Sequence, residues 1–574
     1  MISGLHHYAL EVPDLAVAEG FLQDFGLETS EKDGSLVARC PGRDQDQVRL
    51  VQAPAKRLHH VTFTLRPGSM DAVREALDRA GTPVIEPPAG ATEEGLWIRD
   101  PDGTAVQLLP TEPAPSRPVA EVLVNIGATQ QRLNVAQWTQ ATKDVLPRRL
   151  GHSLLFTAQP GPMTDFYTQV LGLRLSDTIH HDRVTFLNAG AGDHHVFGFI
   201  ASTHPGFHHA SFEVPSIDAI AIGADRMRAR GRGAGWGLGR QDGYHAERRH
   251  PHLRRRPGEG LADLHRRRPR LRSMITLTDV AYVRSGAADL DTAKRFATEI
   301  VGLELVAPSE QGVAHLRADH RHHCLALVQG PSGVIASGFT VADSDALEVA
   351  ETELERAGLA VHRGSEAEAR CRRVREFIAF DDPFGNRIEL VSQQETVARP
   401  VAFSRAAGIT EFGHLCLDAP DVHEAYRFWS TRFNARVSDW LGDAACLMRI
   451  DPVHHKLAVF RGDGPGLCHM NFQVDSIDDV FRNWHFLQEH HVEIEMGPGR
   501  HPQSTAIFLY FLGPEGFTYE YSYGVRRIED EAGWVPRTFD PAEPGSIDMW
   551  LGPTTRPVTQ PQVRTGQPAG AGLS

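Results

Sequence analysis

The feature that most constrains this chain is an internal repeat with a period of about 50–60 residues. Each copy has a short apolar segment, a loop, an amphipathic helical pattern and further strand-like segments, as in HHYALEVPDLAVAEGFLQDFG at 6–26. The pattern restarts at His59, Gly151, Phe207, Thr276, Ser337, Gly413 and Cys468. A βαβββ unit leaves one apolar sheet face exposed, so eight such units are expected to pair. The sequence therefore predicts an α+β fold of repeated βαβββ modules, paired into four domains.

Several repeats close with a turn of the type D-P-x-G before their last strand. The copies are DPDG at 101–104, DPFG at 382–385 and the variant GPEG at 513–516. Proline restricts the turn, and glycine supplies the positive φ that leads into the strand. We therefore expect a strand directly after each of these glycines.

The repeats and the shifts in composition between them give a domain plan. We expect paired-module domains at 1–115, 145–240, 274–395 and 408–530, an irregular linker at 241–273 and a disordered tail at 552–574. The linker holds ten Arg and no Lys against four acidic residues and lacks an apolar period, which favours a solvated connection over nucleic-acid binding. A further hypothesis is that two tandem copies are joined by a stretch read in the wrong frame, which sequencing of the encoding DNA would test.

Composition excludes several classes of function. The formal net charge of −14 argues against nucleic acid as the main partner, because phosphate binding needs a basic surface. No apolar run approaches the ~20 residues of a membrane-spanning helix, and no signal peptide is visible, so we expect a cytoplasmic protein. The six cysteines are scattered without a CxxC pair, which favours reduced thiols over disulfides or zinc. The chain has 30 histidines, and because histidine is the commonest metal ligand, this number favours metal binding instead.

Histidine spacing recurs in the two halves of the chain. His414 and His469 open successive modules 55 residues apart, and His152 and His209 do so 57 residues apart. In each half an HH doublet ends 14 residues before the second of these histidines, at His195 and at His455. In the second half, Glu520 lies on the last strand of the last module. Two histidines and one carboxylate on one face of a metal are typical of non-haem Fe(II) oxygenases.

The segment GRHPQSTAIFLYFLGPEGFTYEY adds two more polar residues to this set. It places His501 at the start of one strand, Tyr510 along that strand, and Glu520 on the strand after the turn. The three are therefore expected to approach one another on neighbouring strands.

With these motifs the chain resembles the type I extradiol ring-cleavage dioxygenases of the vicinal oxygen chelate superfamily. That family includes catechol and 2,3-dihydroxybiphenyl dioxygenases, and its signature runs from G-x-H through an aliphatic residue and Tyr to a Pro-x-Gly turn and Glu. Residues 499–520 match it, except that Gly513 stands where Asp or Asn is usual. The resemblance covers 274–530 in full and repeats over 1–240.

The resemblance implies the roles of six residues. Three would hold Fe(II), or Mn(II) as in some members: His414, His469 and Glu520. His455 would be the acid–base near the oxygen-derived species, and Tyr510 and His501 would bond the substrate oxygens. The substrate would be a catechol that is cleaved with O2 beside its two hydroxyls, and the chain could be a homo-oligomer, as family members often are.

The other modules lack a complete set of ligands. Glu520 follows His469 by 51 residues, and the same spacing after His209 leads to Gly260, next to Glu259 in the Arg-rich stretch. The first half therefore lacks a carboxylate in the expected position. We expect His152 and His209 to form an inactive, vestigial site. The first two modules keep His7 and His60 but end in Gln107. Modules five and six have Tyr282 and no histidine in the corresponding strands, although Glu389 closes them. We expect these domains to be structural.

Two alternative functions use the same fold. A glyoxalase-type metal isomerase or lyase would want a fourth protein ligand, and the strand LAVF at 457–460 offers no carboxylate. A non-catalytic ligand-binding protein of the bleomycin-resistance type suits the first half, but it leaves His455, His501 and Tyr510 without a role.

Overall fold

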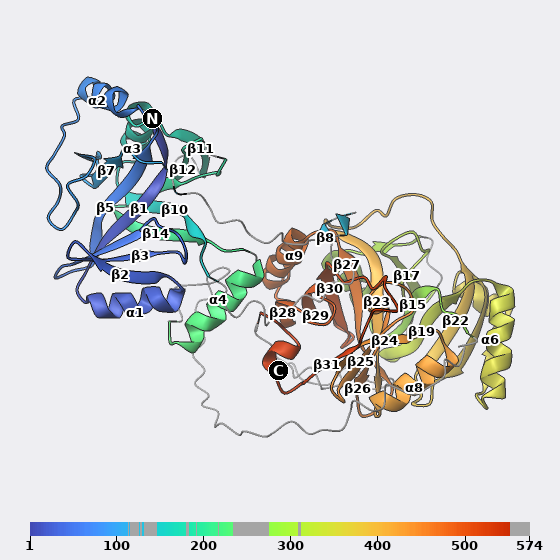
Figure 1. Ribbon diagram of the computed structural model, residues 1–574. Coiled ribbons are helices and arrows are strands. Elements are labelled where there is room, and N and C mark those ends of the chain that lie inside the picture. Colours follow the sequence, from blue (N-terminus) through green and yellow to red (C-terminus); the bar gives the residue numbers. More distant parts are fainter. Residues whose placement is uncertain are drawn as a thin grey trace, which may run out of the picture. The chain divides into compact units, whose positions relative to one another are not determined.

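The computed structural model describes residues 1–112, 114, 125–126, 129–130, 146–179, 183–190, 192–215, 217–232, 275–307 and 311–550. The chain folds into two compact units (Figure 1). The N-terminal unit comprises Met1–Val122 and Gln140–Asp242, and the C-terminal unit comprises Leu123–Thr139 and Gly243–Ser574. The predicted linker at 241–273, with Glu259, and the predicted tail at 552–574 lie outside the described residues. Within the described ranges, no helix is long and apolar enough to cross a membrane.

The first sheet is built by the first two modules of the N-terminal unit. Its seven strands lie in the order β2-β3-β4-β1-β5-β7-β6. The strands are β1 (Ile2–Val12), β2 (Glu28–Lys32), β3 (Ser35–Arg39), β4 (Val48–Gln52), β5 (Arg57–Leu65), β6 (Leu96–Arg99) and β7 (Ala105–Leu109). The helices α1 (Leu15–Phe25) and α2 (Met70–Arg79) follow the first strand of each module.

The second sheet, in the same unit, has five strands in the order β11-β12-β13-β10-β14. They are β10 (Arg149–Thr157), β11 (Arg174–Ile179), β12 (Val184–Asn188), β13 (Phe197–Ala201) and β14 (Gly206–Glu213). Helix α3 (Pro160–Asp165) continues as a π-helical turn, Phe166–Val170, and α4 (Ile217–Ala229) follows β14. The first and second sheets share one hydrophobic core, in which Phe63 contacts Tyr167 and Phe197. A two-stranded ladder, β8 (Asn125–Ile126) with β9 (Thr129–Gln130), lies between them in sequence.

The third sheet opens the C-terminal unit with eight strands in the order β16-β17-β18-β15-β19-β22-β21-β20. They are β15 (Asp279–Ala287), β16 (Glu304–Leu305), β17 (Val313–Arg317), β18 (Leu325–Gln329), β19 (Gly333–Val341), β20 (Val361–Arg363), β21 (Val374–Asp381) and β22 (Arg387–Gln394). The helical segments are α5 (Leu290–Arg295), which runs into a π-helical turn Phe296–Ile300, α6 (Ser344–Arg356) and α7 (Glu366–Cys371).

The fourth sheet carries the site and has nine strands in the order β28-β29-β30-β27-β23-β26-β25-β24-β31. They are β23 (Ile409–Ala419), β24 (Arg436–Leu441), β25 (Ala445–Arg449), β26 (Leu457–Arg461), β27 (Gly466–Val474), β28 (Ile494–Arg500), β29 (Ile507–Leu512), β30 (Thr518–Tyr523) and β31 (Arg537–Phe539). The helices are α8 (Val422–Arg432), α9 (Ile477–Glu489) and a 3₁₀ turn, Pro544–Ser546. The predicted domain range ends at 530, and β31 joins the sheet from beyond it.

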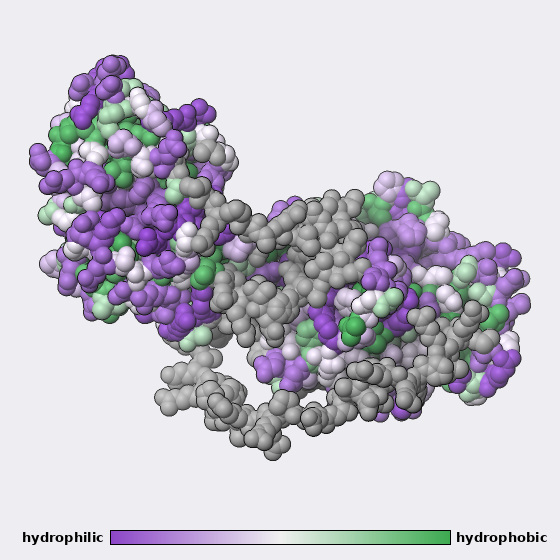
Figure 2. Space-filling model, viewed as in Figure 1, coloured by the Kyte–Doolittle hydropathy of each residue, from purple (hydrophilic) through white to green (hydrophobic). Residues whose placement is uncertain are grey.

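The four sheets share one strand connectivity, and this confirms the predicted fold class. In each, the first strand of a module pairs in parallel with the last strand of that module and antiparallel with the first strand of the next, as β23 does with β26 and β27. The loop after that first strand often supplies an Asp whose carboxylate caps the following helix, at Asp14, Asp289 and Asp421. The surface in Figure 2 is mainly hydrophilic with scattered apolar residues, as expected when each sheet buries its apolar face inside its unit.

The closing turns have the predicted backbone. Gly103, Gly385 and Gly516 have φ of 83°, 93° and 78°, and strands β7, β22 and β30 begin two residues after each of them. A side chain is strained in this left-handed region, which explains glycine at the fourth position of each turn.

Candidate metal centre

Three neighbouring strands of the fourth sheet carry the central residues of the site. His414 on β23 lies opposite Asn471 on β27, and Asn471 lies opposite Glu520 on β30. His469 precedes Asn471 by two residues, so its side chain points to the same face. The ladder register therefore places two imidazoles and one carboxylate side by side, although they are far apart in sequence.

The ligand atoms of these three residues converge closely. The Nε2 atoms of His414 and His469 lie 3.1 Å apart, and Glu520 Oε2 lies 3.1 Å from the first and 3.3 Å from the second. All three side chains are buried. Two nitrogens bound to one ion at ~2.1 Å would lie about 3.0–3.4 Å apart, so the spacing fits ligands of a single ion.

The charges at this point also fit a cation. Burial lowers the pKa of His414 to about 4, in spite of the opposing effect of Glu520. Burial alone would raise the pKa of Glu520, but the adjacent His414 and His469 imidazoles hold it well below its usual range. Glu520 Oε2 is buried without a well-aligned hydrogen bond among the described side chains. A buried carboxylate that faces imidazole nitrogens is costly unless a positive charge is present, so the donor set suits a divalent metal.

His455, just before β26, lies beside this cluster. Its ring centroid is 4.2 Å from that of His414, and its Nδ1 is 3.1 Å from Nδ1 of His454. His454 Nε2 lies 3.0 Å from Asp439 Oδ2, and the Arg537 guanidinium also donates to Asp439. If His454 donates to Asp439, it accepts at Nδ1 from His455, which leaves the lone pair of His455 on Nε2. Burial lowers the pKa of His455 well below its usual range, and the His414 ring adds to the decrease.

His501 and Tyr510 meet on the other side of the cluster. His501 lies in the loop between β28 and β29, not at the start of β29 as predicted, because β29 begins only at Ile507. His501 Nε2 is 2.9 Å from Tyr510 Oη and 3.9 Å from Glu520 Oε1. The carbonyl of Ile547 accepts a hydrogen bond from His501 Nδ1 at 2.7 Å, so Nε2 is free to accept from the Tyr510 hydroxyl.

A cavity adjoins these residues and is mostly apolar. Its polar lining includes His455, His469, His501 and Tyr510. Its apolar lining is Leu441, Ala445, Leu447, Phe460, Met496 and Ile547. Among the described residues that line it, none is Lys or Arg, and the only carboxylate is Glu495. The cavity thus suits a small, largely apolar molecule with a polar edge directed at the cluster.

The segment 537–550, which we name the C-terminal strap, forms part of this cavity. Its strand β31 pairs in parallel with β24, and Arg537 donates to the Gln503 carbonyl at 3.0 Å. Further on, the Ser546 carbonyl accepts from Gln503 Nε2 and Asp548 Oδ1 accepts from the backbone N–H of Arg500. The strap therefore fixes both the His501 loop and the position of Ile547.

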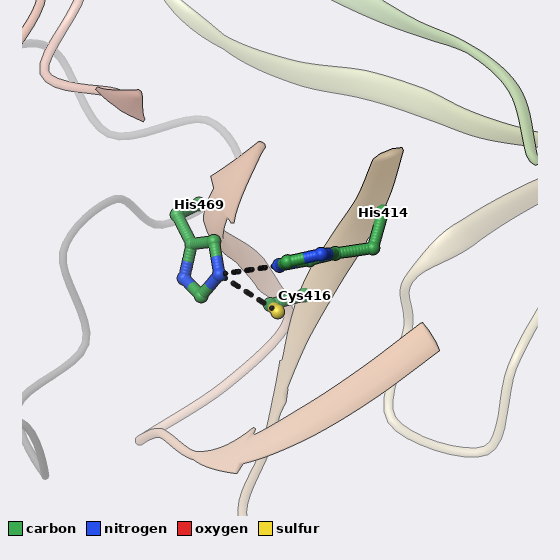
Figure 3. A group of neighbouring side chains, drawn as sticks. All are labelled: His414, Cys416 and His469. Atoms are coloured by element: carbon green, nitrogen blue, oxygen red, sulfur yellow. Dashed lines mark hydrogen bonds between the residues drawn. The ribbon is translucent and has the colours of Figure 1, made fainter. Parts of the chain in front are cut away.

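Sequence reasoning missed one residue beside the ligands. Cys416 Sγ lies 3.1 Å from His469 Nε2, and Figure 3 shows the sulfur directed at the same imidazole as His414. His414, Cys416 and His469 each bring one ligand atom within 4.8 Å of the others. The signal was present in the sequence, since Cys416 follows His414 by two residues on a strand and so shares its face.

The third sheet holds different residues at the same register. Tyr282 lies opposite Gly338, and Gly338 lies opposite Glu389, as His414, Asn471 and Glu520 do in the fourth sheet. Here Glu389 accepts from the Tyr282 hydroxyl at 2.7 Å and from both arms of Arg372. The guanidinium supplies the positive charge, so no metal is needed to balance the carboxylate.

The N-terminal unit contains two incomplete versions of the cluster of two histidines and one carboxylate. In the first sheet, His7 Nε2 lies 3.2 Å from His60 Nε2, and Gln107 at the carboxylate position accepts from Thr62. In the second sheet, His152 Nε2 lies 3.0 Å from His209 Nε2, and the His195 ring lies 4.3 Å from that of His152. Beyond β14, the described part of this sheet has no further strand on which a carboxylate could lie.

Several curated proteins are similar to the chain. It is 36% identical over 241 residues to metapyrocatechase 2 of Cupriavidus necator, covering 42% of this chain and 74% of that protein. It is 27% identical over 282 residues to 1,2-dihydroxynaphthalene dioxygenase of Sphingobium xenophagum, covering 46% and 94%. It is 25% identical over 300 residues to the iron-dependent extradiol dioxygenase of Rhodococcus jostii (strain RHA1), covering 48% and 97%.

A sequence model described as the Glyoxalase/Bleomycin resistance protein/Dioxygenase superfamily matches the chain three times. The matches lie at residues 149–247, 280–390 and 411–521, which together exceed half of the chain. They coincide with the second, third and fourth sheets. The chain therefore belongs to the Glyoxalase/Bleomycin resistance protein/Dioxygenase superfamily.

Proposed function

We propose that this chain is an extradiol dioxygenase that cleaves the aromatic ring of a catechol with O2. The observation that carries the proposal is the convergence of His414, His469 and Glu520 in one buried cluster, next to a cavity that His455, His501 and Tyr510 line. The names of the relatives support the same activity, since they include a metapyrocatechase and an extradiol dioxygenase. The activity is an oxidoreductase reaction that incorporates both atoms of O2.

Fe(II) is the metal that we propose for the site, with Mn(II) as the alternative. His414 Nε2, His469 Nε2 and Glu520 Oε2 would hold it and leave positions open for other ligands. When bound, the metal would bring diol and O2 together and mediate electron transfer between them. The relative from Rhodococcus jostii is named as iron-dependent, which favours iron.

The surrounding residues would orient the substrate and move protons. Tyr510 and His501, which contact each other at 2.9 Å, would bond the diol oxygens and set the ring's orientation. His455, with its lone pair on Nε2, would accept a proton there and return it during the reaction. The apolar wall would exclude water from the reacting atoms.

The lining of the cavity also favours one class of catechol. Without a Lys or Arg among its described lining residues, and with Glu495 present, it would disfavour a substrate that carries a carboxylate. We therefore expect catechol or 2,3-dihydroxybiphenyl to be cleaved in preference to 3,4-dihydroxyphenylacetate.

A glyoxalase-type isomerase is less favoured than a dioxygenase, because the strand expected to supply its fourth ligand has no carboxylate. The strand that would supply its fourth ligand is β26, and Ala458 there lies opposite Cys416. No carboxylate lies on β26 (Leu457–Arg461).

The test is to load the full chain with Fe(II) without oxygen, add each catechol and admit O2. We expect a yellow ring-fission product and consumption of one O2 per catechol, both lost in His414→Ala. Metal-loaded protein that consumes no O2 with any catechol would contradict the proposal.

A further inference from the structure

We infer that Cys416 is a fourth protein ligand of the metal site when no substrate is bound. The inference rests on the proposed function, because it concerns the same metal. Cys416 lies on β23 two residues after His414, and it lies opposite His469 in the ladder. Figure 3 shows its sulfur on the side of the His469 ring that faces His414.

The distances place the sulfur among the ligand atoms. Two atoms bound to one ion, a nitrogen at ~2.1 Å and a sulfur at ~2.3 Å, lie about 3.1–3.6 Å apart. Cys416 Sγ is 3.1 Å from His469 Nε2, the same distance that separates the two imidazole nitrogens. The sulfur therefore stands where a further ligand of the same ion would stand.

The surroundings of the thiol favour coordination once a metal is present. Cys416 is fully buried in an apolar cluster with Leu447, Ala458 and Cys468. If the thiol donates to His469 Nε2, which lies 3.1 Å away, it uses the lone pair that a bound metal would occupy. The S–H group would then lose that acceptor, whereas coordination as thiolate, with release of the proton to solvent, satisfies the sulfur.

Coordination by sulfur has two consequences. A thiolate favours iron, cobalt or zinc over manganese or magnesium, because it is a soft ligand. It also occupies one of the three positions that two histidines and a carboxylate leave open, and a chelating diol and O2 together need all three, so we expect the diol to displace it. In that exchange a diol hydroxyl passes its proton to the sulfur, and both protons and charge balance.

The test uses cobalt as the probe. Co(II) added to the metal-free full chain under nitrogen should give a near-ultraviolet sulfur-to-cobalt charge-transfer band together with visible ligand-field bands. We expect the charge-transfer band in the native chain and in Cys468→Ser, the control thiol beside His469, and its loss in Cys416→Ser. Addition of catechol should remove the band from the native chain.

Each outcome is decisive. Ligand-field bands without a charge-transfer band in the native chain would refute ligation by Cys416 and leave the metal site intact. A band that persists in Cys416→Ser would refute it too, and a band that survives catechol would refute displacement. Failure of Co(II) to bind at all would contradict the proposed metal site itself.

Discussion

At the scale of single residues, charge balance distinguishes the candidate centre from its relatives within the chain. Glu520 and Glu389 occupy equivalent register positions, yet Glu389 is paired with the Arg372 guanidinium at 2.7 Å while Glu520 faces two imidazoles. A buried carboxylate with a guanidinium is already neutralised, whereas one that faces only imidazoles attracts a cation. The same fold thus yields a structural ion pair in one sheet and a candidate metal site in another.

His455 provides the first prediction at this scale. His455→Ala should lower kcat for ring cleavage by about 10²–10⁴-fold, the usual contribution of a general acid–base. Bound iron, measured by elemental analysis, should remain, because the three proposed ligands are unchanged. His320→Ala, an exposed histidine outside the site, is the control. A loss of iron in His455→Ala would show that His455 acts as a ligand instead.

Asp100 gives a prediction about pH and stability. It lies in the closing turn of the first sheet, and burial raises its pKa from 3.8 to about 7 in spite of hydrogen bonds from Thr104 and Tyr167. Asp100 therefore binds its proton more tightly in the folded than in the unfolded chain, so its own contribution to stability falls as pH rises through this window. Between pH 5 and pH 8 this contribution of Asp100 should decrease by about 2–3 kcal/mol.

Asp100→Asn should remove this loss, since the amide keeps the turn without ionising. Urea unfolding at pH 5 and pH 8 measures it, with the exposed Asp71→Asn as control. If the change in stability between pH 5 and pH 8 is the same in Asp100→Asn as in the native chain, the assignment to Asp100 is wrong.

Much of the candidate site could be predicted from residue types and spacing. The two histidine spacings and the segment 499–520 pointed to His414, His469 and Glu520, because the ladder register repeats from module to module. The Arg372 partner of Glu389 could not be predicted, since it depends on which side chain of another element reaches the carboxylate. Cys416 has no CxxC partner, and only strand alternation, two residues after His414, places it beside the ligands.

At the scale of elements, the C-terminal strap is the part that the sequence did not predict. The repeat ends near 530, and the strap has no helical or alternating pattern that predicts how it packs. Its contacts depend on tertiary partners, chiefly Asp439 and Gln503, which hold Arg537. By contrast, the strands and helices of each module follow local patterns and were predicted.

Ile547 gives the prediction at this scale. Ile547→Ala should enlarge the apolar wall and raise the preference for a bulkier apolar catechol over catechol itself, measured as the ratio of kcat/KM, by about tenfold. The backbone carbonyl that orients His501 is retained, so iron content should not change. Val535→Ala, 76% exposed and just before the strap, is the control. An unchanged ratio would mean that Ile547 does not limit the substrate.

At the scale of the whole molecule, one module is repeated with different residues on its last strand. The fourth sheet alone, among the described residues, brings two histidines and a carboxylate together at the shared register, while the first ends in Gln107 and the third in a carboxylate–guanidinium pair. Most of the chain therefore supports the fold, and its chemistry is expected in the C-terminal unit.

Iron stoichiometry tests the central claim most directly. The full chain, loaded with Fe(II) without oxygen and freed of unbound metal, should retain about one iron per chain. Glu520→Gln should retain almost none, and the matched variant Glu389→Gln, at the same register in the third sheet, should retain about one. Iron that stays with Glu520→Gln, or that is lost from Glu389→Gln, would contradict a single centre built on His414, His469 and Glu520.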